Sequence, residues 1–144
     1  MERIKSLTLG TKLVLVAATA FFLNLSLTWQ KIEVDFGPAG TAERMLDGWD
    51  AWGLLLGVLS LGLVALTVVC HLTDVELSET VRWDRITLAL GGLLFFVTVV
   101  KNLLDDGSTI ASYVGIGLAA VVLTGAWLDV RRAATARASS AARA

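Results

Sequence analysis

Residues 49–70 read WDAWGLLLGVLSLGLVALTVVC, and this stretch decides the fold. From Ala51 to Cys70 it holds no Asp, Glu, Lys, Arg or His. Three further apolar runs cover residues 9–29, 86–104 and 109–128. Each run has about 20 residues, which at a rise of about 1.5 Å per residue makes a helix long enough to cross the ~30 Å hydrocarbon core of a bilayer. The sequence therefore predicts an all-α membrane protein, a bundle of four transmembrane helices.

The composition agrees with a membrane protein. The chain has 144 residues, of which 56% are hydrophobic, and its mean hydropathy is +0.72. A soluble domain is usually about 45–50% apolar. The formal net charge is −1, and no basic stripe with interleaved aromatic residues is present, so no nucleic-acid partner is expected.

The loop charges predict the orientation. Positively charged residues gather in the short cytoplasmic loops of membrane proteins. With both termini cytoplasmic, only Lys31, Arg44 and Lys101 lie outside. The remaining lysines and arginines then lie inside: Arg3, Lys5, Lys12, Arg82, Arg85, Arg131, Arg132, Arg137 and Arg143. We therefore expect a multi-pass protein of the cell membrane with cytoplasmic N- and C-termini.

Aromatic residues and one lysine are expected to anchor the bundle at the two membrane surfaces, where Trp and Tyr are enriched. The predicted inner anchors are Trp83 and Trp127. Lys101, at the outer end of the third span, is expected to extend to the headgroups and to pair with Asp105 one helical turn later. The alternative is a functional lysine.

The loop between the first two spans is expected to be short and partly ordered. Residues 32–36 alternate between apolar and acidic side chains, which predicts a short strand. Gly37–Gly40 predicts a turn, and Thr41 is expected to begin a short helix that ends at Leu46. The loop is acidic overall, which makes it the candidate outer recognition region; the alternative is a solvated connector. The candidate recognition residues are Trp29, Glu33, Asp35, Trp49, Asp50 and Trp52.

Small residues are expected to let the helices approach closely, because helices in lipid associate through close packing and polar contacts. The candidate packing or partner positions are Gly53, Gly57, Ala111, Gly115 and Ala119. Asn24 joins them, since an unpaired amide in hydrocarbon costs several kcal/mol. Residues 1–130 thus form one transmembrane domain. Residues 131–144 are an Ala- and Arg-rich, flexible cytoplasmic tail, whose arginines are expected to contact anionic lipid headgroups.

Motifs of known chemistry are absent from the sequence. It holds no phosphate-binding loop, zinc spacing, nucleophile elbow or dinucleotide fingerprint. We therefore predict no enzyme activity, no catalytic or metal site and no cofactor.

A family resemblance rests on two features: a first span that ends in Trp29, and Gly48-Trp49-Asp50-Ala51-Trp52-Gly53 at the start of the second span. In both, the chain resembles small four-span integral membrane proteins of actinobacteria. The resemblance implies the fold and no established activity. The chain is similar to claudins in architecture alone, because the paired loop cysteines of claudins are missing.

Three functions stay open at this point. The first is a non-catalytic membrane subunit or scaffold that associates with a larger membrane protein complex through its helices and outer loop. The second is a small channel or transporter formed by a homo-oligomer, with Asn24, Thr98 or Thr124 along the path. The third is a membrane enzyme that uses the carboxylates of the outer loop.

Overall fold

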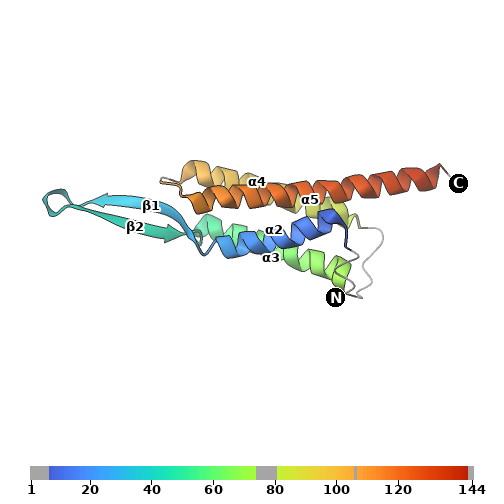
Figure 1. The fold of residues 1–144 in the computed structure, drawn as a ribbon, viewed down its shortest axis with the longest axis horizontal. Coiled ribbons are helices and arrows are strands. Elements are labelled where there is room, and N and C mark those ends of the chain that lie inside the picture. The colour runs from blue at the N-terminus through green and yellow to red at the C-terminus, as the bar shows by residue number, and fades with distance from the viewer. Residues whose placement is uncertain (1–6, 74–80, 106, 143–144) are drawn as a thin grey trace.

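The computed structural model describes residues 7–73, 81–105 and 107–142, and these are mostly helical. The described helices are α2 (Leu9–Asn24), α3 (Ala51–Leu72), α4 (Trp83–Leu104) and α5 (Ile110–Ala141). A β-hairpin of β1 (Thr28–Asp35) and β2 (Thr41–Asp47) separates α2 from α3. Figure 1 shows the helices side by side, with the hairpin projecting from one end of the bundle. We call this end the hairpin end and the opposite end the tail end.

Three of the helices, α3, α4 and α5, are long and apolar enough to cross a membrane. The fourth, α2, is apolar but has only 16 residues, or about 24 Å. The first span was predicted to continue to Trp29, but its helix ends at Asn24. The chain leaves the helix there because Trp29 folds back against it, and the indole Nε1 donates a hydrogen bond to the backbone oxygen of Asn24 at 2.8 Å.

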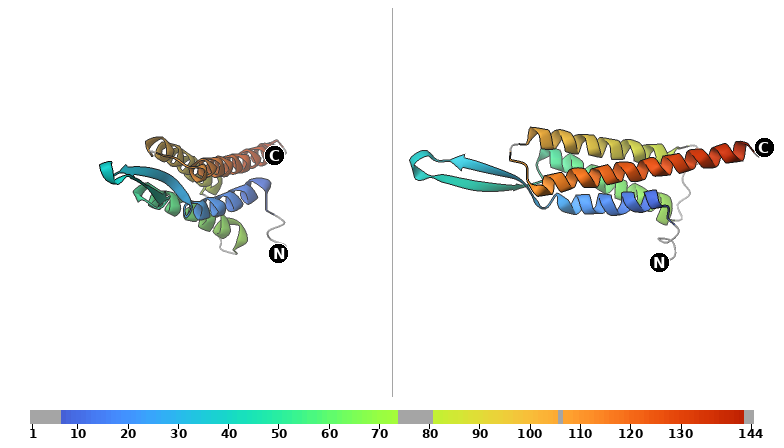
Figure 2. Two further views of the ribbon diagram at one scale, coloured as in Figure 1. Left: turned by 60° about the vertical axis from the view of Figure 1, so that its left-hand side comes forward. Right: turned by 45° about the horizontal axis from the view of Figure 1, so that its top comes forward.

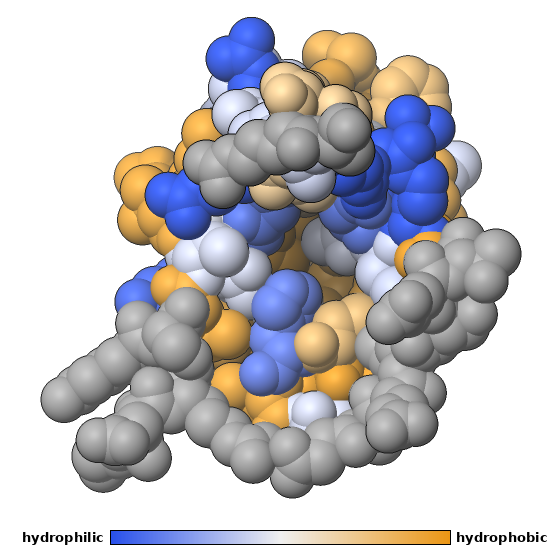
Figure 3. Space-filling view, turned by 90° about the vertical axis from the view of Figure 1, so that its right-hand side faces the viewer, coloured by the Kyte–Doolittle hydropathy of each residue, from blue (hydrophilic) through white to orange (hydrophobic). Residues whose placement is uncertain are grey.

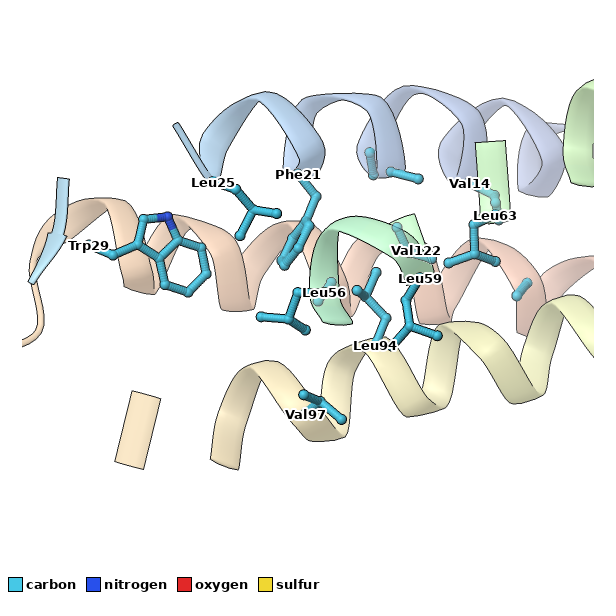
Figure 4. Close-up of a cluster of buried hydrophobic side chains, with 14 residues drawn as sticks. Val14, Phe21, Leu25, Trp29, Leu56, Leu59, Leu63, Leu94, Val97 and Val122 are labelled. Atoms are coloured by element: carbon cyan, nitrogen blue, oxygen red, sulfur yellow. The ribbon is translucent and has the colours of Figure 1, made fainter. Parts of the chain in front are cut away.

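The four helices form a closed ring of neighbours. Helix α2 packs against α3 and α5, and α4 packs against the same two helices. Successive helices run in opposite directions along the bundle (Figure 2). The core between them is a row of buried apolar side chains from all four helices, with Phe21, Leu56, Leu94 and Val122 fully buried (Figure 4). Trp29 closes this row at the hairpin end.

The loop between α2 and α3 differs from its prediction in one half. The predicted strand is part of β1, and Gly37 and Gly40 form the turn with positive φ angles. The short helix predicted from Thr41 is wrong, because residues 41–47 form β2, paired antiparallel with β1. A helix of six residues is too short to be stable by itself, whereas the neighbouring strand supplies backbone hydrogen bonds to every second residue.

The tail also differs from its prediction. Helix α5 continues without interruption to Ala141, although residues from 131 onwards were predicted to be flexible. Ala and Arg are both strong helix formers, so the helix started in the apolar run propagates into the tail. Its last turns extend beyond the other helices (Figure 2).

Candidate functional site at the hairpin end

A buried lysine is the central feature of the hairpin end. The Lys101 side chain is 0% exposed, and its Nζ donates to Asp50 Oδ2 at 2.6 Å and to Asp105 Oδ2 at 2.7 Å. The Asp105 side chain is also largely buried, while the Asp50 side chain is 44% exposed. The charge of the lysine is therefore balanced by ion pairs inside the bundle, and the side chain does not extend outward to the membrane surface as predicted.

The sequence places this cluster through two local rules. Asp50 is the N-cap of α3, with Oδ1 accepting from the Gly53 backbone N–H at 2.7 Å, which leaves Oδ2 for the lysine. Asp105, the C-cap of α4, follows Lys101 by four residues, or about one helical turn. The sequence predicted the Asp105 contact. It missed the Asp50 contact, because no local pattern shows that α3 begins beside the end of α4.

Trp29 joins the hairpin to the bundle. It belongs to β1, yet it is 0% exposed. Its ring lies edge-on to Phe21, with centroids 6.2 Å apart, and Lys101 Nζ lies 5.8 Å from its centroid. That distance suits a cation–π interaction. Trp29 is thus a fully buried core residue, and it is not exposed for the recognition role predicted for it.

Asn24 and Gly115 form the close contact between α2 and α5. Asn24 is 5% exposed, and its Nδ2 donates to the backbone oxygen of Ala111 at 3.0 Å. A Cβ on Gly115 would lie 2.7 Å from the Trp29 ring and 3.1 Å from Asn24 Nδ2. Ala119, one turn further along α5, is fully buried. The small residues of α5 therefore face α2 and leave room for the Asn24 amide and the Trp29 indole.

Gly53 and Gly57 serve a different contact, although their spacing is that of a helix-packing motif. A Cβ on Gly53 would overlap the backbone oxygen of Gly48, and one on Gly57 would lie 2.5 Å from the Trp49 ring. Both glycines therefore make room for the chain that enters α3. Trp49 also donates to Ser26 Oγ at 3.2 Å, which ties this entry to the end of α2.

The base of the hairpin is held by the turn between α4 and α5. The Lys31 N–H donates to the backbone oxygen of Gly107 at 3.0 Å, and the Thr109 N–H donates to that of Trp29 at 3.0 Å. The Thr109 hydroxyl donates to the backbone oxygen of Thr28. Residues 107–109 thus cover the open edge of β1 close to the bundle, and they fix the direction in which the hairpin projects.

The outer part of the hairpin has two different faces. Paired residues share a face, so the register places Ile32 opposite Arg44 and Val34 opposite Ala42 on one side. We call this side the apolar face; its apolar residues are Ile32, Val34, Ala42 and Leu46, and it also carries Gln30 and Arg44. The alternate residues form the acidic face, which carries Glu33, Asp35 and Glu43 beside Lys31, Thr41 and Met45, with Glu33 directly opposite Glu43.

Both faces are open to solvent. All residues from Lys31 to Pro38 are exposed, including Ile32 and Val34 at 37% each. Asp35 is engaged in the turn, where its Oδ1 accepts from the Gly37 N–H. In the described part of the chain, no three or more His, Cys, Asp or Glu side chains gather as metal ligands.

The residues named for a channel each donate a hydrogen bond to a backbone carbonyl. Thr98 is buried and donates to the Leu94 carbonyl of its own helix, and Thr124 is exposed and donates to Ala120 in the same way. Asn24 is occupied by Ala111. The candidate recognition residue Trp52 is 45% exposed, and the predicted inner anchor Trp127 is 44% exposed. The other predicted inner anchor, Trp83, is partly buried at the tail end.

The fold and this end of the bundle define a class: a mostly helical protein with three candidate membrane spans and a β-hairpin fixed at its base. The chain matches no protein-family model, and searches of the curated proteins and of the solved structures found no match.

Proposed function

We propose that this protein is a non-catalytic subunit of the cell membrane that crosses the bilayer four times and binds a partner protein through its hairpin. Three helices meet the length and hydropathy of a span, and α2 lies among them in the same bundle. The shorter α2 reaches across with its flanking residues or a locally thinner bilayer. The loop charges favour both termini in the cytoplasm, with the hairpin outside.

The observation that carries the proposal is the contrast between the base and the outer part of the hairpin. The base is fixed by Trp29 and by residues 107–109. The outer part exposes Ile32 and Val34, as well as the backbone edge of β2. A two-stranded hairpin is marginally stable in water without a surface that covers it, and open edges with apolar side chains are sites of pairing with other chains.

The charge of the hairpin indicates the chemistry of the partner. Residues 30–48 carry Lys31 and Arg44 against Glu33, Asp35, Glu43 and Asp47. Glu33 lies directly opposite Glu43, with Lys31 one pair away on the same face, so a further positive group would stabilise this pair of carboxylates. A second copy of the chain would bring another acidic hairpin to the contact. The hairpin therefore suits a different protein, one with an apolar strip bordered by Lys or Arg.

Site-specific cross-linking in the native membrane tests this proposal. A photoreactive side chain at Val34 should yield one defined adduct with a second protein, and Ile32→Asn should reduce the yield at least fivefold. Glu43→Lys should reduce the yield of the adduct as well. An acidic residue introduced at the contact position of the identified partner should restore that yield. Val58→Asn, which changes an exposed apolar residue of α3 at 63% exposure, is the control away from the hairpin and should leave the yield unchanged.

Two results would overturn the proposal. One is an adduct formed with a second copy of this chain alone. The other is a free monomer in native membranes, with no adduct from any position on either face of the hairpin.

A further inference from the structure

A second candidate site lies at the tail end, away from the hairpin. There the four helices surround a cavity of about 260 Å³. Figure 3 looks onto this end and shows a hollow bordered by hydrophilic residues, with hydrophobic ones deeper inside. Since a water molecule takes about 30 Å³ of liquid volume, the space suits a small molecule or the headgroup of a lipid.

Two polar atoms of the cavity-lining residues have unused hydrogen-bonding capacity. Trp83 Nε1 and Asp84 Oδ2 are shielded from solvent, and neither has a hydrogen-bond partner. Leaving such groups unsatisfied costs about 1–3 kcal/mol each. One is a donor and the other is an acceptor, so a ligand that offers both functions would satisfy them.

The threonines and carboxylates of the cavity supply acceptors. Thr67 and Thr87 donate their hydroxyl protons to carbonyl groups of their own helices, which leaves the oxygen lone pairs free. Thr11 donates to Asp129 at 2.9 Å. Two carboxylates, Asp84 and Asp129, belong to the lining. A complementary ligand must therefore bring several N–H donors and a positive charge, which is the chemistry of an ammonium group.

Asp84 is the residue best placed for such a cation. Its Oδ2 forms ion pairs with Arg137 at 3.7 Å and with Arg82 at 3.9 Å. Both distances are too long for hydrogen bonds, so a closer cation is not excluded by them. The two arginine side chains are 53% and 41% exposed, so they keep capacity to bind an anionic group.

We propose that this cavity binds a small primary ammonium with an adjacent oxygen acceptor, an amino-alcohol, either free or as a phospholipid headgroup. The ammonium donates to Asp84 and to the free lone pair of Thr87. The oxygen next to it accepts from Trp83 Nε1. In the phospholipid form, the phosphate lies towards Arg82 and Arg137.

Calorimetry with the purified full chain tests the site, with ethanolamine as the probe. Ethanolamine should bind, whereas ethylene glycol, which lacks the charge, should bind at least tenfold more weakly. Asp84→Asn should weaken ethanolamine binding at least tenfold. Its matched control at the hairpin end, Asp47→Asn, should change nothing. Trp83→Phe should weaken ethanolamine binding and leave ethylamine, which lacks the oxygen, unaffected.

A second arm distinguishes the two sources of the ligand. Protein from nanodiscs of mixed phosphatidylethanolamine and phosphatidylcholine is released for native mass spectrometry. Selective retention of phosphatidylethanolamine, reduced by Asp84→Asn, identifies the lipid; its absence together with ethanolamine binding identifies the free amino-alcohol. If Asp84→Asn fails to fold, Thr87→Val tests the same site, because it preserves the side-chain shape and removes the hydroxyl; it should weaken binding. Thr135→Val, at an exposed position of α5, is its control.

The proposal fails under either of two outcomes. In the first, ethanolamine and ethylene glycol bind equally or not at all while no phosphatidylethanolamine is retained. In the second, the cavity variants match their controls in both arms. Neither outcome bears on the hairpin, so this site and the proposed function stand or fall separately.

Discussion

Replacing Lys101 with Met should destabilise the bundle by about 3 kcal/mol. The substitution keeps most of the side-chain volume but removes the only charge that Asp105 contacts among the described residues. Breaking a buried ion pair costs about 3–5 kcal/mol, because the remaining charge is left uncompensated. Here the Asp105 side chain is 11% exposed and carries that cost, while Asp50 at 44% exposure is hydrated and keeps its bond to the Gly53 N–H. The lower end of the range therefore applies.

The second variant in this series separates charge from packing. Adding Asp105→Asn to Lys101→Met removes the stranded charge, and replacing a buried ion pair with neutral groups is often nearly neutral in free energy. The double variant should recover to within about 1 kcal/mol of the original protein. The two changes are thus strongly non-additive, as expected for groups in direct contact.

Reversible unfolding in mixed detergent, followed by circular dichroism, measures these differences. A loss of about 3 kcal/mol corresponds to roughly a hundredfold change in the unfolding equilibrium. Lys31→Met, at an exposed lysine of the hairpin, is the control and should stay within about 0.5 kcal/mol. The reasoning is refuted if Lys101→Met behaves like this control, or if Asp105→Asn adds further loss instead of restoring stability.

Three further predictions concern the bundle. Asn24→Leu should cost about 0.6–2 kcal/mol in the same unfolding assay, because it removes the bond between α2 and α5; no measurable loss would show that the amide bond contributes nothing. Gly115→Val should destabilise by more than about 2 kcal/mol, since its Cβ would lie 2.7 Å from the Trp29 ring, whereas Gly117→Val, with open space around it, should be neutral; equal effects would contradict the packing. In a cysteine-free chain, Ala42→Cys should react with an impermeant maleimide from outside intact cells and a cysteine near the C-terminus should not; the reverse pattern would overturn the orientation.

The long apolar runs were predictable because hydropathy is a local property. The runs at 51–72 and 83–104 are helices of 22 residues each, close to their predicted bounds. The end of the helix in the first run was not predictable, since the residues after Asn24 are apolar enough to continue a helix. The contacts of Trp29 with the end of α2 and with Gly115 in the first turns of α5 explain why they leave it.

The hairpin was half predictable for a similar reason. Residues 32–36 alternate, and alternation is visible in one strand alone. Residues 41–47 carry no such pattern, and their strand exists through pairing with β1. The buried position of Lys101 also depends on two distant segments, because the N-cap of α3 must meet the end of α4. Local sequence therefore predicts the elements, and contacts across the bundle decide where they end.

The same contacts explain why the hairpin suits binding. A long, flexible loop loses conformational entropy when it binds, and that loss lowers its affinity. Here Trp29 and residues 107–109 already fix the base, so only the outer part beyond Ile32 has freedom left to lose. The charges of Lys101 and Asp105 are neutralised beneath it and do not oppose a partner that approaches from the hairpin end. A partner can therefore use most of the contact energy of the apolar face for binding, and this argument predicts that loosening the base, by Thr109→Ala, weakens binding without touching the interface.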